Sequence, residues 1–484
     1  MLTPTQELAT RPGQHLSVTA NAGSGKTRVL VERYLRLVLE GYAPVQKIVA
    51  LTYTEKAAGE LKRRIAARVS EVLLSTADAG QTARLEAVRA QLPSAFVGTI
   101  HAFCARLLRE HPIEAGVDAG FIVLEGLDRT IMLEDAVRET FFDILRAGAS
   151  HPLRDSVFDL LRTLGKGKVL HILTALIRRR ELLDRWSGGR SPYDLPDADV
   201  LAMWDRSIRE FLEAEASSKE VTEAVEALVR HADGKKASAA QAAGQAVLEA
   251  PSPMDRAFAL RKFVEAVLTA AGGIYKAVVA EPDRRLEREA KRLAVWRSSD
   301  VPLLDHLANG TGEADHRLLL SQTRILMDVL RLAMERYARK KQETAALDFE
   351  DLQLLARDLL SQEAVRRHLA RTYSHILVDE YQDTNHLQYE ILLPLLDDLR
   401  SGNLFIVGDP KQSIYGFRNA DVEVFYRTRT DIMEWTGPAG AVVLGESFRP
   451  LRDLVAFVNH VFGPLLGGAG AHPHRRRLTR VQRP

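Results

Sequence analysis

A glycine-rich run that ends in a lysine and a threonine lies near the start of the chain. Residues 20–27 follow the Walker A pattern, with Ala20 at the place of the usual first glycine. Small residues let backbone N–H groups curl around a phosphate chain at a helix N-terminus. Lys26 would then reach the β- and γ-phosphates, and the Thr27 hydroxyl would ligate Mg²⁺. The residues of this predicted phosphate loop are Ala20, Asn21, Ala22, Gly23, Ser24, Gly25, Lys26 and Thr27.

Two adjacent carboxylates follow an apolar run much further along the chain. Ile376–Val378 has the pattern of a buried strand, and it ends in Asp379 and Glu380. Open α/β sheets bind ligands outside the carboxyl ends of their strands, which is where this pair would lie. We expect Asp379 to hold Mg²⁺ and Glu380 to orient and deprotonate the attacking water. An isolated Asp-Glu pair is usually a solvated turn, so it is the phosphate loop upstream that favours the catalytic interpretation.

A second apolar strand, Leu404–Val407, precedes an amide and two aromatic rings. Gln412 is placed to sense a γ-phosphate after this strand. Tyr415 and Phe417 are two residues apart, so both rings point the same way if the segment is extended. Aromatic rings beside an arginine, here Arg418, suit the stacking of nucleic-acid bases. The alternative is that both rings belong to the hydrophobic core.

The elements that must position these residues have an α/β pattern at both ends of the chain. His15–Ala20 and Lys47–Tyr53 are predicted to be buried strands, whereas Lys26–Leu39 and Glu55–Val69 are predicted to be helices. Strand, glycine-rich turn, helix and strand in this order indicate a parallel sheet. From about residue 127 to 346 strand signals vanish and helical periodicity persists, which predicts a helical insertion. The α/β pattern returns at about residue 347.

Composition limits the class of protein further. The 484 residues are 46% hydrophobic and 27% charged, with a net charge of +2, so bulk charge does not indicate a nucleic-acid binder. The single cysteine, Cys104, excludes a disulfide framework and a cysteine-based metal site, which fits a cytoplasmic protein. No apolar stretch is long enough to predict a membrane span. The Arg-rich end is typical of a disordered tail, and a basic DNA-binding tail is the alternative.

Eight segments in order resemble the motifs of UvrD/Rep-type superfamily 1 DNA helicases. They look like the Q motif, motifs I, Ia and Ib, the segment before motif II, and motifs II, III and IV. In the same order they are Leu2–Gln6, Ala20–Thr27, Leu51–Ala58, Gly98–Phe103, Leu347–Leu352, Val378–Thr384, Val407–Ala420 and Leu444–Arg449.

The resemblance implies a P-loop RecA-like α/β domain with a parallel sheet, a large all-helical insertion and the start of a second RecA-like domain. Residues 1–126 and 347–438 would form the two parts of the first RecA-like domain, and residues 127–346 would form the insertion. Residues 439–464 would start the second domain, and residues 465–484 would be the Arg-rich tail.

The resemblance also assigns roles to single residues. Gln6 would read the adenine edge, and Arg28 and Phe448 would sandwich the adenine ring. Gln412 and Arg449 would contact the γ-phosphate, Arg449 from the second motor domain. Other residues would line a track for single-stranded DNA, and for one of them, the histidine, a structural hydrogen bond is the alternative. These track residues are Tyr53, Thr99, His101, Tyr415, Phe417 and Arg418.

An intact member of this family would couple ATP hydrolysis to 3′-to-5′ translocation on single-stranded DNA. The segments 408–415 and 447–450 look most like AddA- or RecB-type subunits of helicase–nuclease complexes, which process double-strand breaks for recombination. The resemblance therefore implies ATP and Mg²⁺ as cofactors. It implies two kinds of partner, which are DNA ends and a second nuclease–helicase protein similar to AddB.

Motifs V and VI and a nuclease domain are not found in the sequence. We therefore expect a truncated chain whose Arg-rich ending reflects a frameshifted or artificially ended reading frame. The rival hypothesis is a catalytically incomplete remnant that binds ATP or DNA without turnover. A P-loop kinase or GTPase is the third class, and the pair Asp379 and Glu380 together with the paired aromatic rings argues against it.

Overall fold

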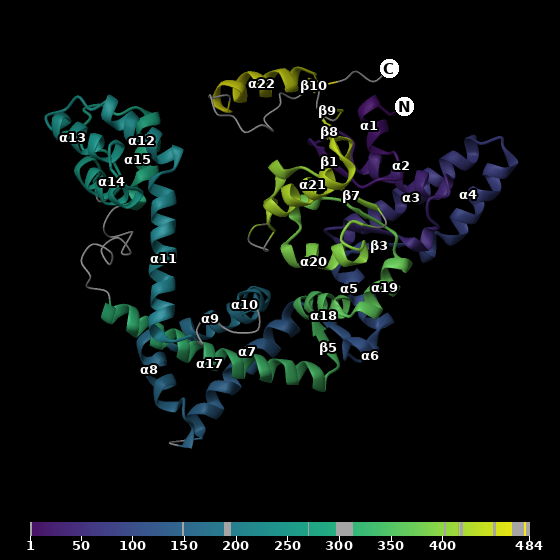
Figure 1. Ribbon diagram of the computed structural model, residues 1–484, viewed down its shortest axis with the longest axis horizontal. Coiled ribbons are helices and arrows are strands. Elements are labelled where there is room, and N and C mark those ends of the chain that lie inside the picture. Colours follow the sequence, from purple (N-terminus) through teal and green to yellow (C-terminus); the bar gives the residue numbers. More distant parts are fainter. Residues whose placement is uncertain are drawn as a thin grey trace. The chain divides into compact units, whose positions relative to one another are not determined.

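The computed structural model describes residues 2–147, 150–187, 195–269, 271–296, 313–400, 403–414, 416, 420–448, 452–466 and 479–480. The chain forms two compact units (Figure 1). The first unit is Met1–Met132 together with Ala338–Pro484, and the second is Leu133–Tyr337. The first is an α/β unit and the second is helical, which confirms the predicted fold class.

A six-stranded sheet with the order β3-β2-β6-β7-β1-β8 forms the centre of the first unit. Every neighbouring pair is parallel. Val378 lies beside Ile406, and Gly408 lies beside Thr19, so β6, β7 and β1 end at the same edge of the sheet, with β7 reaching two residues beyond the end of β6. The strands are β1 (Leu16–Ala20), β2 (Ile48–Thr52), β3 (Phe96–Thr99), β6 (His375–Val378), β7 (Asn403–Gly408) and β8 (Ala441–Leu444).

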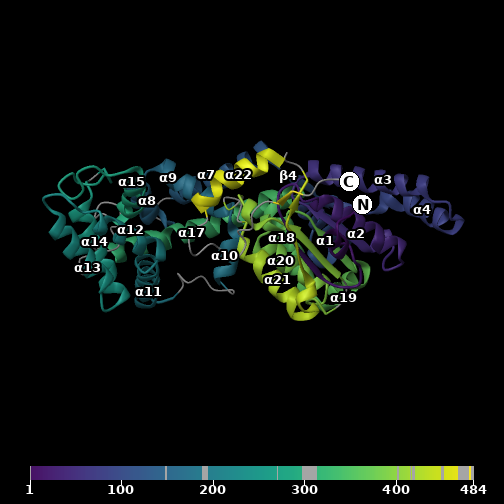
Figure 2. The same ribbon diagram turned by 90° about the horizontal axis from the view of Figure 1, so that it is seen from above.

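Helices cover both faces of this sheet. Alternate residues of a strand point to opposite faces, so Val49 packs in one hydrophobic core and Ala50 in the other. Strands buried on both faces carry continuous apolar runs, which explains why they were recognisable in the sequence. Figure 2 shows α3 on one side of the sheet and α20 and α21 on the other. The helices are α1 (Pro4–Ala9), α2 (Lys26–Leu39), α3 (Glu55–Ser75), α4 (Ala79–Gln91), α5 (Ile100–Glu110), α6 (Pro112–Ala115), α18 (Phe349–Ser361), α19 (Glu363–Thr372), α20 (His386–Leu395) and α21 (Val422–Thr436).

The second unit has its own hydrophobic core, in which Phe263 and Trp296 are buried. Two helices, α7 (Gly126–Arg146) and α17 (Glu313–Glu343), cross the boundary between the units. In the first unit, β4 (Ile122–Leu124) and β5 (Ala346–Asp348) pair in parallel at the ends of the insertion. The remaining helices of the second unit are α8 (Arg154–Leu164), α9 (Lys166–Ile177), α10 (Arg180–Ser187), α11 (Asp197–Ala216), α12 (Lys219–Arg230), α13 (Ala237–Leu248), α14 (Pro253–Val267) and α15 (Arg284–Leu293).

One predicted domain boundary is wrong. Ala441–Leu444 was expected in a second RecA-like domain, but it pairs with β1 from Ser17 to Ala20 as the edge strand of the first sheet. The physical reason is that Val442 and Leu444 are buried in the same core as Val18. Beyond β8, the structure describes β9 (Glu446–Ser447), α22 (Arg452–Leu466) and β10 (Thr479–Arg480), and the rest of the predicted tail lies outside the described residues.

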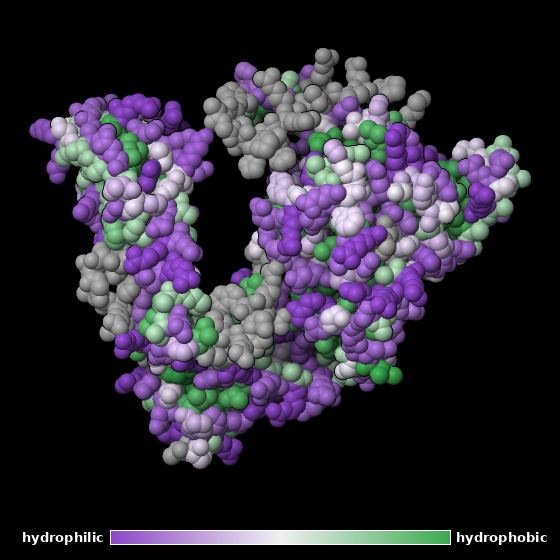
Figure 3. Space-filling view, in the orientation of Figure 1, coloured by the Kyte–Doolittle hydropathy of each residue, from purple (hydrophilic) through white to green (hydrophobic). Residues whose placement is uncertain are grey.

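Hydrophilic residues cover most of the molecular face drawn in Figure 3, with apolar residues scattered between them. This surface fits the gathering of apolar side chains in the cores. Among the described residues, none of the helices combines the length and the apolar character needed to cross a membrane.

Two buried histidines, His15 and His375, lie at the amino ends of β1 and β6, the two strands that flank β7. The Leu404 N–H donates to Nδ1 of His15 over 2.9 Å, and Nε2 of His15 lies 3.0 Å from the Leu399 carbonyl oxygen. Nδ1 must therefore be unprotonated and Nε2 must donate, which is the neutral ring. Burial lowers the pKa of His15. Burial, with the nearby charge of Arg33, also lowers the pKa of His375 to about 4.

We predict that acid destabilises the first unit through these rings. Since the pKa of His375 falls from 6.5 to about 4 on folding, the unfolded chain binds more protons between these values. Stability is therefore full above the unfolded pKa and is lost as the pH falls through this window, by roughly 2 kcal/mol at pH 5. Melting temperatures at pH 7.5 and 5 should differ less in His375→Gln than in the parent. His171→Gln, at an exposed position, is the control and should keep the difference of the parent. The same difference in melting temperature in both variants would contradict the prediction.

Candidate nucleotide-binding site

The phosphate loop joins β1 to α2 in a conformation that depends on two glycines. Gly23 and Gly25 have φ angles of +77° and +88°, in the left-handed region that side chains disfavour. The Ser24 N–H donates to the Asn21 carbonyl, which closes the loop over 3.2 Å. Gly25 is the N-cap of α2, so the free N–H groups of the first turn of α2 face the loop. This is an anion-binding arrangement of the kind that the sequence predicted.

Gln6 supports the loop from the first helix. Its amide Nε2 donates to the Ser24 carbonyl over 2.9 Å, and its Oε1 accepts from the Thr3 N–H over 3.1 Å. A Cβ atom on Gly25 would come within 2.9 Å of Gln6 Nε2, so glycine is needed here for space as well as for backbone conformation. The adenine contact implied for Gln6 stays a prediction, and the structure adds a supporting role that the sequence analysis missed.

The segment after β8 closes the other side of the loop. The Ser447 hydroxyl donates to the Ala22 carbonyl over 2.8 Å, and the Phe448 N–H donates to the Gly23 carbonyl over 2.9 Å. Phe448 therefore lies beside the loop, and Arg28 is exposed on the first turn of α2, while their contacts with adenine stay predictions. Arg449 lies outside the described residues. Ser447 was missed because a lone serine carries no signal in the sequence.

Motif I and motif II meet directly through one ion pair. The Lys26 ammonium donates to Oε2 of Glu380 over 2.7 Å. Glu380 has a φ of 51°, a conformation that costs a non-glycine residue of order 1 kcal/mol and that clusters at functional sites. The Asp379 carboxylate accepts from the N–H of Glu380 over 3.0 Å. The side chain held in this strained turn is thus the one that the sequence predicted to activate water.

The electrostatics of the site favour a divalent cation. Burial, aided by the charge of Glu380, raises the pKa of Asp379 to about 6 against the opposing effect of Lys26. Burial and the charge of Glu380 raise the pKa of Asp383 to about 6 as well. Asp379, Glu380 and Asp383 thus place three carboxyl groups beside Lys26, and Mg²⁺ would neutralise part of their charge. Thr27 and Asp379 supply the oxygen atoms that this ion prefers, so the residues present fit the predicted metal.

Motif III joins the site through its own hydrogen bonds. Nε2 of Gln412 donates to Oδ2 of Asp409 over 2.7 Å, and the Asp409 N–H donates to Oε1 of Gln382 over 2.9 Å. Lys411 donates to the side-chain oxygen of Asn21 in the phosphate loop. Gln412 is therefore anchored near motifs I and II, and its contact with the γ-phosphate stays a prediction. Roles for Gln382 and Asp409 were not predicted, because these common residue types indicate no function until their hydrogen-bond partners in the fold are known.

The predicted DNA track begins at the same edge of the sheet. Thr99 caps α5 by accepting from the Ala102 N–H, and its hydroxyl donates to Glu55 over 2.8 Å. Tyr53, which follows β2, is half-buried. Three further members of the predicted set, Tyr415, Phe417 and Arg418, lie outside the described residues.

His101 has a packed environment. Its ring meets Phe349 edge-on with centroids 4.9 Å apart, and its Nε2 lies 3.1 Å from Nε2 of Gln353. Burial, with the charge of Arg129, lowers the pKa of His101 to about 4, so the ring is neutral at physiological pH. These contacts favour the structural alternative for His101, and its direct contact with DNA stays a prediction.

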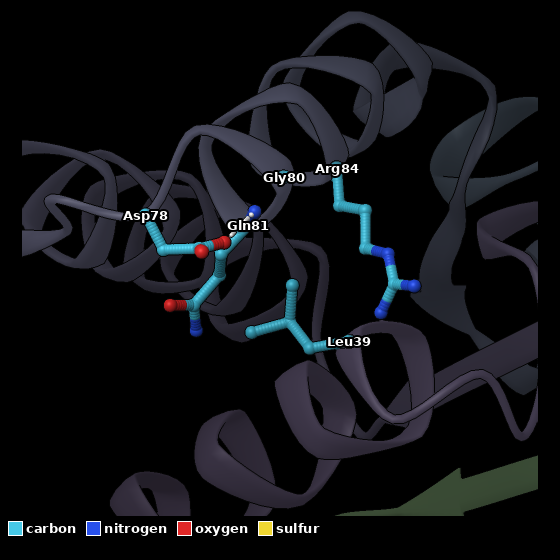
Figure 4. Close-up of a pocket in the computed structure, with 5 residues that line it drawn as sticks. All are labelled: Leu39, Asp78, Gly80, Gln81 and Arg84. Atoms are coloured by element: carbon cyan, nitrogen blue, oxygen red, sulfur yellow. Dashed lines mark hydrogen bonds between the residues drawn. The ribbon is translucent and has the colours of Figure 1, made fainter.

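A separate small pocket lies near the other end of α2. It has a volume of about 340 Å³ and is lined by Leu39, Asp78, Gly80, Gln81 and Arg84 (Figure 4). Asp78 caps α4 by accepting from the Gln81 N–H over 2.6 Å. Since Lys26 and Leu39 are the two ends of a helix that rises 1.5 Å per residue, the pocket is roughly 20 Å from the phosphate loop.

The fold and the site define the class as an α/β protein with a RecA-like parallel sheet and a glycine-rich loop between β1 and α2. Residues 2–433 match the family model of the UvrD/REP helicase N-terminal domain, and the chain belongs to that family. It is 29% identical to the A-subunit of the ATP-dependent helicase/nuclease from Lactobacillus delbrueckii subsp. bulgaricus, and 94% of the chain is covered. It is 28% identical to the proteins of the same name from Syntrophomonas wolfei subsp. wolfei and Latilactobacillus sakei subsp. sakei, with 95% and 96% of the chain covered.

These matches span only part of each relative. The chain covers 39%, 38% and 55% of the lengths of the three relatives. The activities of the whole relatives can therefore only be proposed for this chain.

We predict that Gly25→Ala weakens nucleotide binding at least tenfold, a loss of about 1.4 kcal/mol. The new methyl group makes the left-handed conformation that the loop requires at this position unfavourable, and it displaces Gln6 from the Ser24 carbonyl. Titration with a fluorescent ATP analogue measures the loss. Gly59→Ala is the matched control, because a Cβ on this helical glycine meets nothing within 4 Å. It should bind nucleotide normally and melt slightly higher. Normal binding in both variants would refute the prediction.

Proposed function

We propose that this chain carries the motor site of an ATP-dependent DNA helicase or translocase that moves 3′ to 5′ on single-stranded DNA. The observation that carries the proposal is the 2.7 Å contact between Lys26 and Glu380, which joins the phosphate loop to the carboxylate of motif II. Membership of the UvrD/REP family supports the same conclusion. The relatives named as ATP-dependent helicase/nuclease proteins support a place in double-strand break repair and recombination.

The reaction follows from the positions of the side chains. ATP would draw Lys26 from Glu380, because the β- and γ-phosphates offer it a stronger negative charge. Glu380 is then free to accept a proton from a water molecule that attacks the γ-phosphorus, while the bond from that phosphorus to the β–γ bridging oxygen breaks. Thr27 and Asp379 would hold Mg²⁺, which neutralises charge on the phosphates. Gln412, anchored by Asp409, would contact the γ-phosphate.

DNA would cross the carboxyl edge of the same sheet. Tyr53 and Thr99 follow or end strands β2 and β3, which are neighbours in the sheet. A ring at this edge can stack on a base without regard to sequence, as a translocase requires. Single-stranded DNA and DNA ends are the proposed substrates, a protein similar to AddB is the proposed partner, and the cytoplasm is the proposed location.

The second candidate is a remnant that binds ATP or DNA without turnover. DNA-stimulated ATP hydrolysis by the 484-residue chain separates the two candidates. Stimulation that Lys26→Ala abolishes supports the motor, and ATP binding without any hydrolysis supports the remnant.

We predict that Glu380→Gln binds ATP but hydrolyses it roughly 10²–10⁴-fold more slowly, the range lost when a general base is removed. The glutamine keeps the size of the side chain but cannot accept the proton from water. Binding of a fluorescent ATP analogue and steady-state phosphate release measure the two effects. Glu390→Gln on α20 serves as a control for the removal of one carboxylate. Normal turnover in Glu380→Gln would disprove the role of Glu380.

We predict that Tyr53→Ala weakens binding of single-stranded DNA by about 1–3 kcal/mol, the usual contribution of one stacked base. His101→Ala should instead lower the melting temperature, because it removes the edge contact with Phe349. Fluorescence anisotropy with labelled oligonucleotides and thermal melts measure both variants. A larger loss of DNA affinity in His101→Ala than in Tyr53→Ala, with unchanged stability, would reverse the two assignments.

A further inference from the structure

Gln382 is buried two residues after Glu380, with 2% of its surface exposed. Both ends of its amide are occupied. Nε2 donates to Oε2 of Glu380 over 2.9 Å, and Oε1 accepts from the Asp409 N–H over 2.9 Å. One side chain therefore bridges the segments that follow β6 and β7.

The bridge is held in place from several directions. The Ser413 hydroxyl donates to the Gln382 carbonyl over 3.1 Å. A Cβ atom on Gly408 would come within 2.4 Å of Gln382 Oε1, so the side chain fills a space that only a glycine leaves open. Buried polar groups that are fully hydrogen-bonded rigidify their surroundings. This amide is thus a fixed bridge and not a mobile surface group.

The bridge completes a line of contacts across the site. The same oxygen, Oε2 of Glu380, accepts both from Lys26 and from Gln382. On the other side, Asp409 accepts from Gln412 over 2.7 Å. Departure of Lys26 toward the phosphates of ATP would leave Gln382 as a donor to Oε2. A change at Lys26 would therefore change the charge that faces Glu380, whose carboxylate Gln382 ties to the backbone of motif III.

We propose that Gln382 is a positioning residue with two tasks, an inference that rests on the proposed function. It holds the Glu380 carboxylate toward the attacking water once Lys26 has left. It also ties that carboxylate to Asp409, so that the nucleotide state reaches residues 409–412. In this proposal Gln382 makes no contact of its own with the nucleotide or the water, because it would act through Glu380.

Gln382→Met tests the first task, because methionine fills a similar volume but cannot donate to Glu380. The DNA-stimulated kcat should fall at least tenfold, with KM for ATP changed less than about threefold. Gln382→Glu keeps an acceptor for the Asp409 N–H and loses the donor, so it should lose kcat as well. Gln388→Met on α20 is the control and should keep both constants.

A comparison in the Glu380→Gln background separates positioning from general damage. If Gln382 acts through Glu380, adding Gln382→Met should change the residual rate less than about twofold. A further tenfold loss in the double variant would indicate structural damage and overturn the inference. Full activity of Gln382→Met would overturn it too.

Hydrogen exchange tests the second task without turnover. Binding of a non-hydrolysable ATP analogue should slow amide exchange in the segment 403–414 of the parent chain, and Gln382→Met should lose that response while still binding the analogue. An equal response in both proteins would refute the coupling. Absence of DNA-stimulated hydrolysis in the parent would count against the proposed function alone, because the exchange experiment would still decide the coupling.

Discussion

The contact between Lys26 and Glu380 is the interaction on which the organisation of the site depends. It joins residues 354 positions apart in the sequence, and the two side chains are 12% and 37% exposed. Removing one partner from a partly buried ion pair leaves an uncompensated charge. The pair can exist because β7 alone separates β1 from β6 and the three parallel strands end at the same edge of the sheet. Every other part of the site is arranged around that edge of the sheet.

The helical insertion interrupts this sheet between β3 and β6, so its two ends must be brought together. β4 and β5 do so by pairing in parallel. Asp348, at the end of β5, is fully buried and caps α18, and its carboxylate lies 3.6 Å from Arg129 and 3.8 Å from Lys341. Those two cations belong to α7 and α17, the helices that enter and leave the insertion. The ends of the insertion are therefore fixed by charge in the same unit that carries the nucleotide site.

Hydrogen bonds between short loops then set the details of the site. Gln6 and Ser447 hold the phosphate loop from two sides, and Gln382 connects motif II to motif III. Each of these side chains contacts a backbone carbonyl or N–H of another segment. Every residue type offers a backbone carbonyl, and all but proline offer an N–H, so the identity of the partner residue does not reveal such a contact in the sequence.

The sequence by itself determined the elements and motifs with local causes. The glycines of the phosphate loop, the apolar runs of β1, β2 and β6, and the start of α2 were predictable because backbone conformation and burial depend on nearby residues. Tertiary structure alone decided that Ala441–Leu444 completes the first sheet and that Gln382 bridges two strands. It also gave His101 a packed environment beside Phe349. These outcomes depend on contacts between segments that are far apart in the chain, and a single sequence does not show which distant segments meet or in what alignment.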